Sequence, residues 1–284
     1  MSKGFVILAQ NSNYGDYLKM AYTLALSIKV TQSETASVSL ITDAVDTVPP
    51  YYSEIFDHII EIPWYDDAHS SEWKIENRWK IYHITPYDET IVLDADMIAL
   101  TDIGHWWKYL NRYNVCFITN PITYRNELIT ETYYRKVFVE NDLPNFYSAF
   151  MYFKKCDFSH QYWKIVELIT KNWQIFYSRF LEESKPKHLS MDVTYALAAK
   201  LMDIQDMMIA PEYITFVHMK GRCQNWKSNS DDWRDCAAAH IDKHGNLKVG
   251  NYKQFGLFHY TEKDFASAIC YVFEELYKES LNYE

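Results

Sequence analysis

The sequence predicts an α/β fold with a mostly parallel central sheet and helices on both of its faces. Two observations support this. The first half of the chain alternates short runs of β-branched and aromatic residues with stretches whose apolar residues recur at helical spacing. Gly and Pro are scarce, at 7 and 8 of 284 residues, which argues against low-complexity or fibrous structure. An order of strand, helix and strand is typical of parallel sheets covered by helices.

The first half supplies these elements in turn. Residues 4–9 form a short apolar run that predicts the first strand, and residues 10–15 form a polar turn. Residues 16–30 predict a helix, because their apolar residues fall on one face. The other predictions for this half are a strand at 38–41, a short helix after the break at Pro49 and Pro50, a strand at 59–62, a helix at 73–84 that stops near Pro86, and a strand at 90–93.

The second half is less regular. Its charged segment at 182–188, EESKPKH, predicts a flexible connector, and His244-Gly245-Asn246 predicts a hairpin turn within 240–249. The predicted strands are 115–119, 147–154, 214–219 and 256–260, and the predicted helices are 159–176, 190–202 with Ser190 as its N-cap, and 265–281. No clear linker separates the halves, so we expect them to share one core.

Composition limits the class of partner. The net charge is −10 and the pI is about 5.5, which disfavours duplex DNA and anionic membrane, because both bind mainly through Lys and Arg. A local patch of Lys220, Arg222, Trp226 and Lys227 is nevertheless compatible with a phosphate or an acceptor, and equally with a solvated face. The acidity suits a protein that recruits a divalent cation.

Cysteine usage and apolar runs predict the compartment. The five cysteines are odd in number, scattered and without a CxxC pair, which favours free thiols in a reducing compartment. The opening MSKGFVILAQ predicts a strand and not a secretion signal. No apolar stretch approaches the roughly 20 residues of a membrane span. We therefore expect a soluble cytoplasmic protein.

Asp94 and Asp96 are the sharpest chemical feature. They directly follow the apolar strand at 90–93 and are separated by Ala95. Two carboxylates about 4 Å apart repel by about 4 kcal/mol at an effective dielectric near 20, which equals roughly three pKa units. A proton, a basic partner or a metal must offset this repulsion, and carboxylate oxygens suit Mg²⁺ or Mn²⁺. The alternative is a strand-end turn in which the two residues cap the backbone.

A second polar cluster, at residues 10–14, follows the predicted first strand. In parallel sheets, ligands bind beyond the carboxyl ends of the strands. Because both clusters lie at such ends, we expect residues 10–14 and 94–96 to face the same crevice.

At this point the chain resembles a known family. VLDADMIALTDI is similar to the DxD segment of the glycogenin-like and lipopolysaccharide galactosyltransferase-like retaining glycosyltransferases. Further segments resemble the family in the family's own order: AQNSNYGDYLKMAYTLALSI, ENRWKIYHITPYDETIVLDAD, NFYSAFMYFKK, LSMDVTYALAA and GLFHYTEKDF. The chain departs from the pattern at Ser148, where the family carries an Asn-x-Gly pattern, and at Val193, where it has Gln.

The resemblance implies a GT-A-type, Rossmann-like fold with an extension on the acceptor side. The whole chain, 1–284, would form one such domain, with 1–103 as the nucleotide-binding half and 104–284 as the acceptor-binding half and C-terminal helix. The implied activity is that of a hexosyl- or related glycosyltransferase. It would take its sugar from a nucleotide diphosphate sugar, with a UDP-sugar as the expected donor, and would transfer it with retention of configuration. The implied cofactor is Mn²⁺ or Mg²⁺.

The resemblance also implies roles for individual residues. Tyr14 would pack on the uracil, with Gln10 and Asn11 near the base. Ala95 would lie near the ribose. Arg78, or else Lys80, and Lys263 would contact the phosphates. The metal ligands would be Asp94, Asp96 and His259, with His218 as a rival to His259. Asp192 matches the family's Asp-Gln pair, so Asp192 and Arg78 are the expected catalytic residues.

Two other functions stay open. One is a sugar-phosphate nucleotidyltransferase, although such enzymes usually carry a Gly-rich triphosphate loop where this chain has Gln10-Asn11-Ser12-Asn13. The other is a non-catalytic carbohydrate- or nucleotide-binding protein of the same fold. The acceptor of the transferase could be a glycan, a protein, a lipid-linked sugar or a modified nucleobase.

Overall fold

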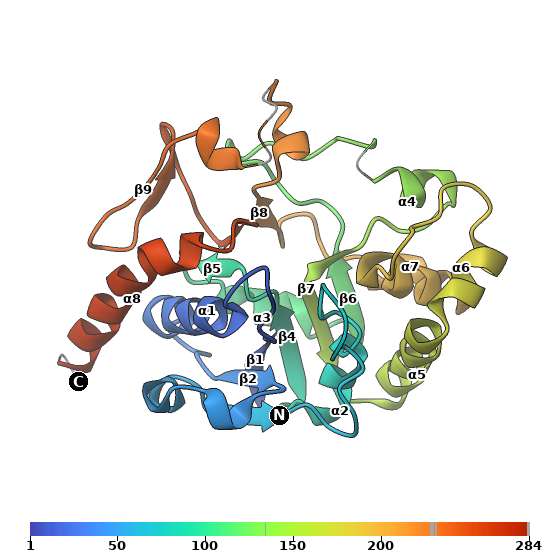
Figure 1. The fold of residues 1–284 in the computed structure, drawn as a ribbon, viewed down its shortest axis with the longest axis horizontal. Coiled ribbons are helices and arrows are strands. Elements are labelled where there is room, and N and C mark those ends of the chain that lie inside the picture. Colours follow the sequence, from blue (N-terminus) through green and yellow to red (C-terminus); the bar gives the residue numbers. More distant parts are fainter. Residues whose placement is uncertain (134, 228–229, 231, 283–284) are drawn as a thin grey trace.

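A six-stranded sheet forms the centre of the computed structural model, which describes residues 1–133, 135–227, 230 and 232–282. Its strand order is β3-β2-β1-β4-β7-β6 (Figure 1). The strands are β1 (Lys3–Leu8), β2 (Val38–Thr42), β3 (His58–Glu61), β4 (Glu89–Leu93), β6 (Val115–Ile118) and β7 (Tyr147–Lys154). Within this sheet β7 runs antiparallel to both of its neighbours, and the other five strands share one direction. The prediction of a mostly parallel sheet is therefore confirmed.

Both faces of this sheet are buried. Along β1, Phe5 and Ile7 belong to one apolar core, and Val6 belongs to the other. This follows from the alternation of side chains along a strand. The inner strands β2 and β4 are accordingly buried along their whole length.

Helices cover both faces, as predicted. The first core packs against α1 (Tyr17–Thr31), α3 (Trp107–Leu110) and α8 (Phe265–Leu281). The second packs against α2 (Ile81–Ile84), α5 (Asp157–Lys171) and α7 (Met191–Leu201). Two further helices are α4 (Lys136–Glu140) and α6 (Trp173–Phe180). No helix in the described part of the chain has the length and apolar character to cross a bilayer.

Two small sheets complete the fold. β5 (Met97–Ala99), β12 (Leu257–His259) and β8 (Phe216–His218) form one, in that order, with β12 antiparallel to β5 and parallel to β8. The other contains β9 (Ala239–Ile241), β10 (Leu247–Val249) and β11 (Tyr252–Lys253). β9 and β10 are the predicted hairpin, and Gly245 in its turn has the positive φ of 77° that favours glycine.

Two helix predictions are wrong. The segment predicted as a helix at 73–84 is helical only from Arg78, as a 3₁₀ turn (Arg78–Lys80) leading into α2. Lys74 adopts a left-handed φ of 54°, which interrupts an α-helix before it starts. The single helix predicted at 159–176 is two helices, α5 and α6, because the backbone of Asn172 leaves the helical region and its side chain caps Leu168.

The remaining predictions match more closely. The short helix after Pro49 is a 3₁₀ turn, Pro50–Glu54, and Ser190 caps α7 through a hydrogen bond from the Val193 N–H. Residues 182–188 form neither helix nor strand. The other 3₁₀ turns are Val45–Thr47, Gly104–Trp106, Gln205–Met208, Gly221–Gln224 and Trp233–Asp235.

Candidate functional site

A cleft of about 850 Å³ opens at the carboxyl ends of β1 and β4. Gln10, which follows β1, and residues 94–96, which follow β4, line the same cleft. The expectation that these two strand ends share a crevice is therefore confirmed for Gln10 and for the Asp94-Ala95-Asp96 segment. His259, Asp192 and Lys263 enter the cleft from later parts of the chain.

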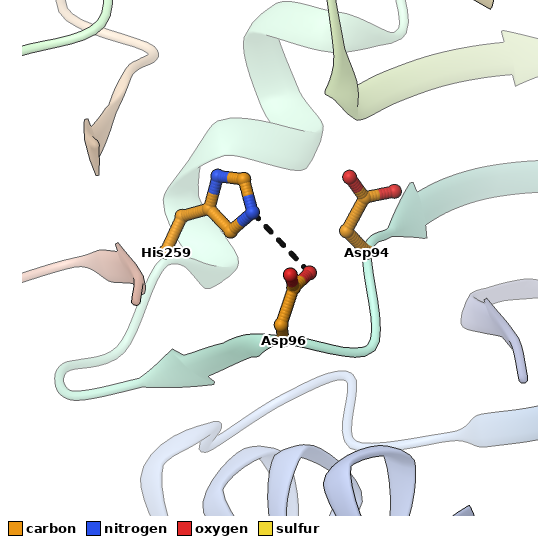
Figure 2. A group of neighbouring side chains, drawn as sticks. All are labelled: Asp94, Asp96 and His259. Atoms are coloured by element: carbon orange, nitrogen blue, oxygen red, sulfur yellow. Dashed lines mark ion pairs between the residues drawn. The ribbon is translucent and has the colours of Figure 1, made fainter. Parts of the chain in front are cut away.

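Backbone pairing holds the acidic segment in place. The Asp94 N–H donates to the carbonyl of Ala149 on β7 (3.1 Å), and the Asp96 carbonyl accepts from the Tyr260 N–H (3.1 Å). His259 ends β12 and lies opposite Met97 in the antiparallel pair with β5. The crossover from the large sheet to the small one thus brings Asp94, Asp96 and His259 together (Figure 2).

The three side chains form a candidate metal site. One ligand atom from each of Asp94, Asp96 and His259 lies within 4.8 Å of the others, and His259 Nε2 lies 3.2 Å from Asp96 Oδ1. Two ligands about 2.0–2.2 Å from one ion lie at most about 4.4 Å apart. The group therefore fits a divalent ion after a contraction of a few tenths of an ångström.

Basic partners also contact both carboxylates. Arg78 pairs with Asp94 through Oδ1 and donates to the Ser148 carbonyl (2.6 Å), while Lys263 pairs with Asp96 through Oδ2. Burial alone would raise the pKa of Asp96, but His259 and Lys263 hold that pKa well below its ordinary value. Basic residues thus offset the carboxylate repulsion, and each carboxylate keeps one oxygen outside its Arg or Lys pair.

His218 lies on the far side of His259 from Asp96. The Nδ1 atoms of the two rings are 3.0 Å apart, and the rings stack with centroids 5.0 Å apart. Burial, together with the neighbouring His259, lowers the pKa of His218 well below its ordinary value. His218 was the rival for the third ligand position, but the group with metal-binding spacing contains His259. A hydrogen bond between the two Nδ1 atoms orients the His259 ring and leaves its Nε2 facing Asp96.

Asp192 lies in the first turn of α7 and lines the cleft. The Ser148 N–H donates to its Oδ1 (2.8 Å), and Arg135 pairs with its Oδ2. The Arg135 guanidinium lies between the rings of Phe138 and Tyr147, 3.8 and 4.0 Å from their centroids. Burial would raise the pKa of Asp192, but Arg135 and Ser148 hold it below its ordinary value. Arg135 was not predicted from the sequence, because it precedes a five-residue helix and belongs to no recognisable pattern.

Of the three residues expected at the nucleotide base, Gln10 lines the cleft, whereas Asn11 and Tyr14 are not among its lining residues. The Gln10 side chain is buried, donates to Asp66 (3.2 Å) and accepts from Asn77 (2.8 Å). Asn11 instead accepts from the Leu18 N–H (2.9 Å) at the start of α1.

The Tyr14 ring, expected on the uracil, is half-exposed and stacks on Trp73, with ring centroids 5.4 Å apart. Of these two, Trp73 is among the residues that line the cleft, so Tyr14 lies at its rim. Trp73 was not predicted as a site residue, because its position at the start of a predicted helix gave no sign of this contact.

For two further predictions, the structure places only some of the named residues in the cleft. Arg78 lines the cleft, but Lys80, the second choice for its role, lines a separate cavity and pairs with Asp67 (3.1 Å). In the basic patch, Lys220 and Arg222 are among the cleft residues, whereas Trp226 packs against Tyr124 instead.

Glu262 is a further titratable residue of the cleft that was not predicted from the sequence. Burial raises its pKa to about 7, against the lowering effect of a hydrogen bond from Thr261.

The unfolded chain releases the Glu262 proton near pH 4.5, so ionised Glu262 destabilises the fold increasingly between pH 4.5 and 7. We expect Glu262→Gln to stabilise the protein at pH 8 and to have little effect at pH 4.5, measured by urea unfolding at both pH values. An equal effect at both pH values would contradict this.

No protein-family profile matches the sequence, and no curated protein sequence matches it either. Solved structures of glycosyltransferases do match the fold. The galactosyltransferase LgtC, in complex with donor and acceptor sugar analogues, aligns with 97% of this chain and 95% of its own at 12% identity and a TM-score of 0.50. Mouse xyloside xylosyltransferase 1 aligns with 91% of this chain and 97% of its own at 10% identity and a TM-score of 0.50.

Longer proteins also match. The bifunctional glycosyltransferase WbbM aligns with 97% of this chain and 49% of its own, at 12% identity and a TM-score of 0.53. GlyE of Streptococcus pneumoniae TIGR4 aligns with 75% of this chain and 46% of its own, at 12% identity and a TM-score of 0.43. The alignments thus cover about half the length of these two proteins. The chain has the glycosyltransferase fold that the resemblance predicted.

Proposed function

We propose that this protein is a metal-dependent glycosyltransferase that takes its sugar from a nucleotide diphosphate sugar, first of all a UDP-sugar. One observation carries the proposal: Asp94, Asp96 and His259 converge in a large cleft at the strand ends of a glycosyltransferase fold. A cleft of about 850 Å³ lies within the range of pockets that bind small molecules.

The donor set fits a hard divalent cation with some affinity for nitrogen. Asp94 and Asp96 supply oxygen, which suits Mg²⁺ or Mn²⁺, and the His259 imidazole favours Mn²⁺ of the two. When bound, the ion neutralises charge on the departing diphosphate. His259 can supply its Nε2 lone pair when its Nδ1–H donates to His218, an arrangement typical of ligating histidines.

Arg78 and Lys263 have one role before the donor binds and another after it has bound. Their charges cancel those of Asp94 and Asp96 in the protein alone. A divalent ion together with a nucleotide sugar diphosphate also sums to zero, so binding adds no net charge to a partly buried site. With the carboxylates engaged by the ion, the two cations are free to donate to phosphate oxygens, where charge develops as the leaving group departs.

The remaining residues position the substrates in this proposal. The stacked pair of Tyr14 and Trp73 offers a flat apolar surface for the base, near the amide of Gln10 and the loop that contains Asn11. Ala95 leaves space for the ribose. Asp192, held by Arg135 and Ser148, orients sugar hydroxyls and acts with Arg78 in catalysis. Retention of configuration rests on the resemblance.

Further parts of the proposal concern the chain as a whole. Residues 1–103 would bind the nucleotide, and residues 104–284 would bind the acceptor: a glycan, a protein, a lipid-linked sugar or a modified nucleobase. All five cysteines are free thiols, which supports a reducing, cytoplasmic location.

Ligand-induced stabilisation tests the proposal. We expect UDP and Mn²⁺ together, at about 100 times the dissociation constant, to raise the melting temperature by roughly 5 °C. Either one alone should have a much smaller effect, because each completes the other's binding site. Differential scanning fluorimetry with a panel of nucleotide sugars, with and without a chelator, measures this. A shift that chelator leaves unchanged would contradict metal dependence, and release of pyrophosphate from a nucleoside triphosphate and a sugar phosphate would favour the nucleotidyltransferase alternative.

A further inference from the structure

A second cavity, of about 430 Å³, is lined by α2 and the 3₁₀ turn before it, by the C-terminal part of α5 and by residues of the segment 64–67. Figure 1 shows α2 and α5. The cavity shares no lining residue with the large cleft. Its lining combines aromatic rings with both signs of charge: Trp64, Tyr65, Asp67, Trp79, Lys80, His83, Glu167 and Lys171.

Trp64 presents a large aromatic surface to solvent from a strained backbone. Its side chain is 70% exposed, as is that of Tyr65, and its φ is 67°. A left-handed φ costs a bulky residue roughly 1–2 kcal/mol. The ring stacks on Trp79, with centroids 5.5 Å apart and planes 11° apart. The surrounding structure therefore holds this exposed ring in one orientation, although exposing it gains nothing for folding.

The rings of Trp79 and His83 also line the cavity. Their nitrogens Trp79 Nε1 and His83 Nε2 are buried and have no hydrogen-bond partner among the described residues, so the two rings present apolar surface to the cavity. Burial lowers the pKa of His83, which favours its neutral form.

Ion pairs add hydrogen-bonding groups at the edge of the cavity. Lys171 Nζ lies 2.6 Å from Glu167, and Lys80 Nζ lies 3.1 Å from Asp67. A flat aromatic face is thus surrounded by donors and acceptors of both kinds. This arrangement matches a molecule with an apolar face and polar groups around its edge.

We propose that this cavity binds a pyranose unit of a carbohydrate. The C–H face of the sugar stacks on Trp64, and its hydroxyls bond to the carboxylate of Glu167 and the ammonium of Lys171. A quaternary ammonium ligand fits less well, because the Lys171 ammonium already lies 4.6 Å from the Trp79 ring centroid. The inference is independent of the proposed transferase function, because it uses none of the cleft residues.

Saturation-transfer NMR titrations test it with methyl α-D-glucopyranoside, methyl β-D-galactopyranoside, maltose and lactose as probes. We expect saturable binding of at least one probe and a loss of affinity of at least about tenfold in Trp64→Ala. Trp64→Phe should retain part of the affinity, because it keeps an aromatic face. Tyr271→Ala, which removes an exposed ring on α8, is the matched control and should bind as the unchanged protein does.

Asp94→Asn separates this site from the large cleft and should leave probe binding unchanged. Circular dichroism and thermal melting check that the Trp64 variants are folded. Four results would overturn the inference. They are no saturable binding of any probe, equal affinity in folded Trp64→Ala, displacement of the probe by UDP with Mn²⁺, which would place the sugar in the large cleft, and competition by choline, which would favour a cation site.

Discussion

Replacement of Asp94 or Asp96 by Asn is expected to lower Mn²⁺-dependent hydrolysis of a UDP-sugar by on the order of 10³-fold or more. Asn keeps the size of the side chain and removes its charge, so the ion loses one of its two anionic ligands. The change also leaves Arg78 or Lys263 without its carboxylate partner, and that cation would then repel the metal. Turnover is measured as UDP release across a series of Mn²⁺ concentrations.

Asp46→Asn is the matched control, because Asp46 is exposed and lies outside the cleft lining. Its turnover should equal that of the unchanged protein. Mn²⁺ affinity, measured by electron paramagnetic resonance, should fall in the two cleft variants and not in the control. Undiminished turnover in both Asp94→Asn and Asp96→Asn would reject the proposed function.

Arg135→Met is expected to cost about 3–5 kcal/mol of unfolding free energy, the range for breaking a buried ion pair from one side. Arg135 is 5% exposed and donates to Asn145 (2.7 Å) and to the Phe146 carbonyl as well as pairing with Asp192. Met fills similar space between the two flanking rings but leaves these acceptors and the Asp192 charge uncompensated. Urea unfolding at pH 7 measures the loss.

A double variant distinguishes the lost charge pair from poor packing. Asp192→Asn in the Arg135→Met background should recover part of the stability, because it removes the uncompensated charge, so the two changes are not additive. Arg112→Met, at an exposed arginine, should change stability by no more than about 0.5 kcal/mol. A loss below 1 kcal/mol in Arg135→Met would show that the pair with Asp192 does not hold this wall of the cleft.

Elements with a strong local pattern were predictable from sequence. β4 and α8 lie where their apolar spacing placed them, and α8 has the predicted bounds, 265–281. The predicted helix at 73–84 failed because distant groups decide that segment: Asn77 bonds to Gln10 and Asp66, and Lys74 donates to the carbonyls of Ala68 and His69. Such hydrogen bonds leave no periodic trace in the sequence.

The residues of the candidate site also differ in whether the sequence alone identifies them. Asp94 and Asp96 were identifiable because they directly follow a buried strand. Arg135 was not identifiable, because its importance comes from Asp192, 57 residues away, and from two rings that pack against it. Trp73 was missed for a similar reason: its contact with Tyr14 joins two loops that follow different strands.

The sequence by itself determined the class of fold and the strand end at which the two carboxylates lie, because strand and helix periodicities are local properties of the chain. Only the tertiary structure decided which groups reach those carboxylates. Lys263 contacts Asp96 across 167 residues of sequence because β12 pairs with β5, whereas Lys80, near Arg78 in the chain, faces another cavity. Pairing between distant strands and the direction of a side chain depend on packing of the whole chain.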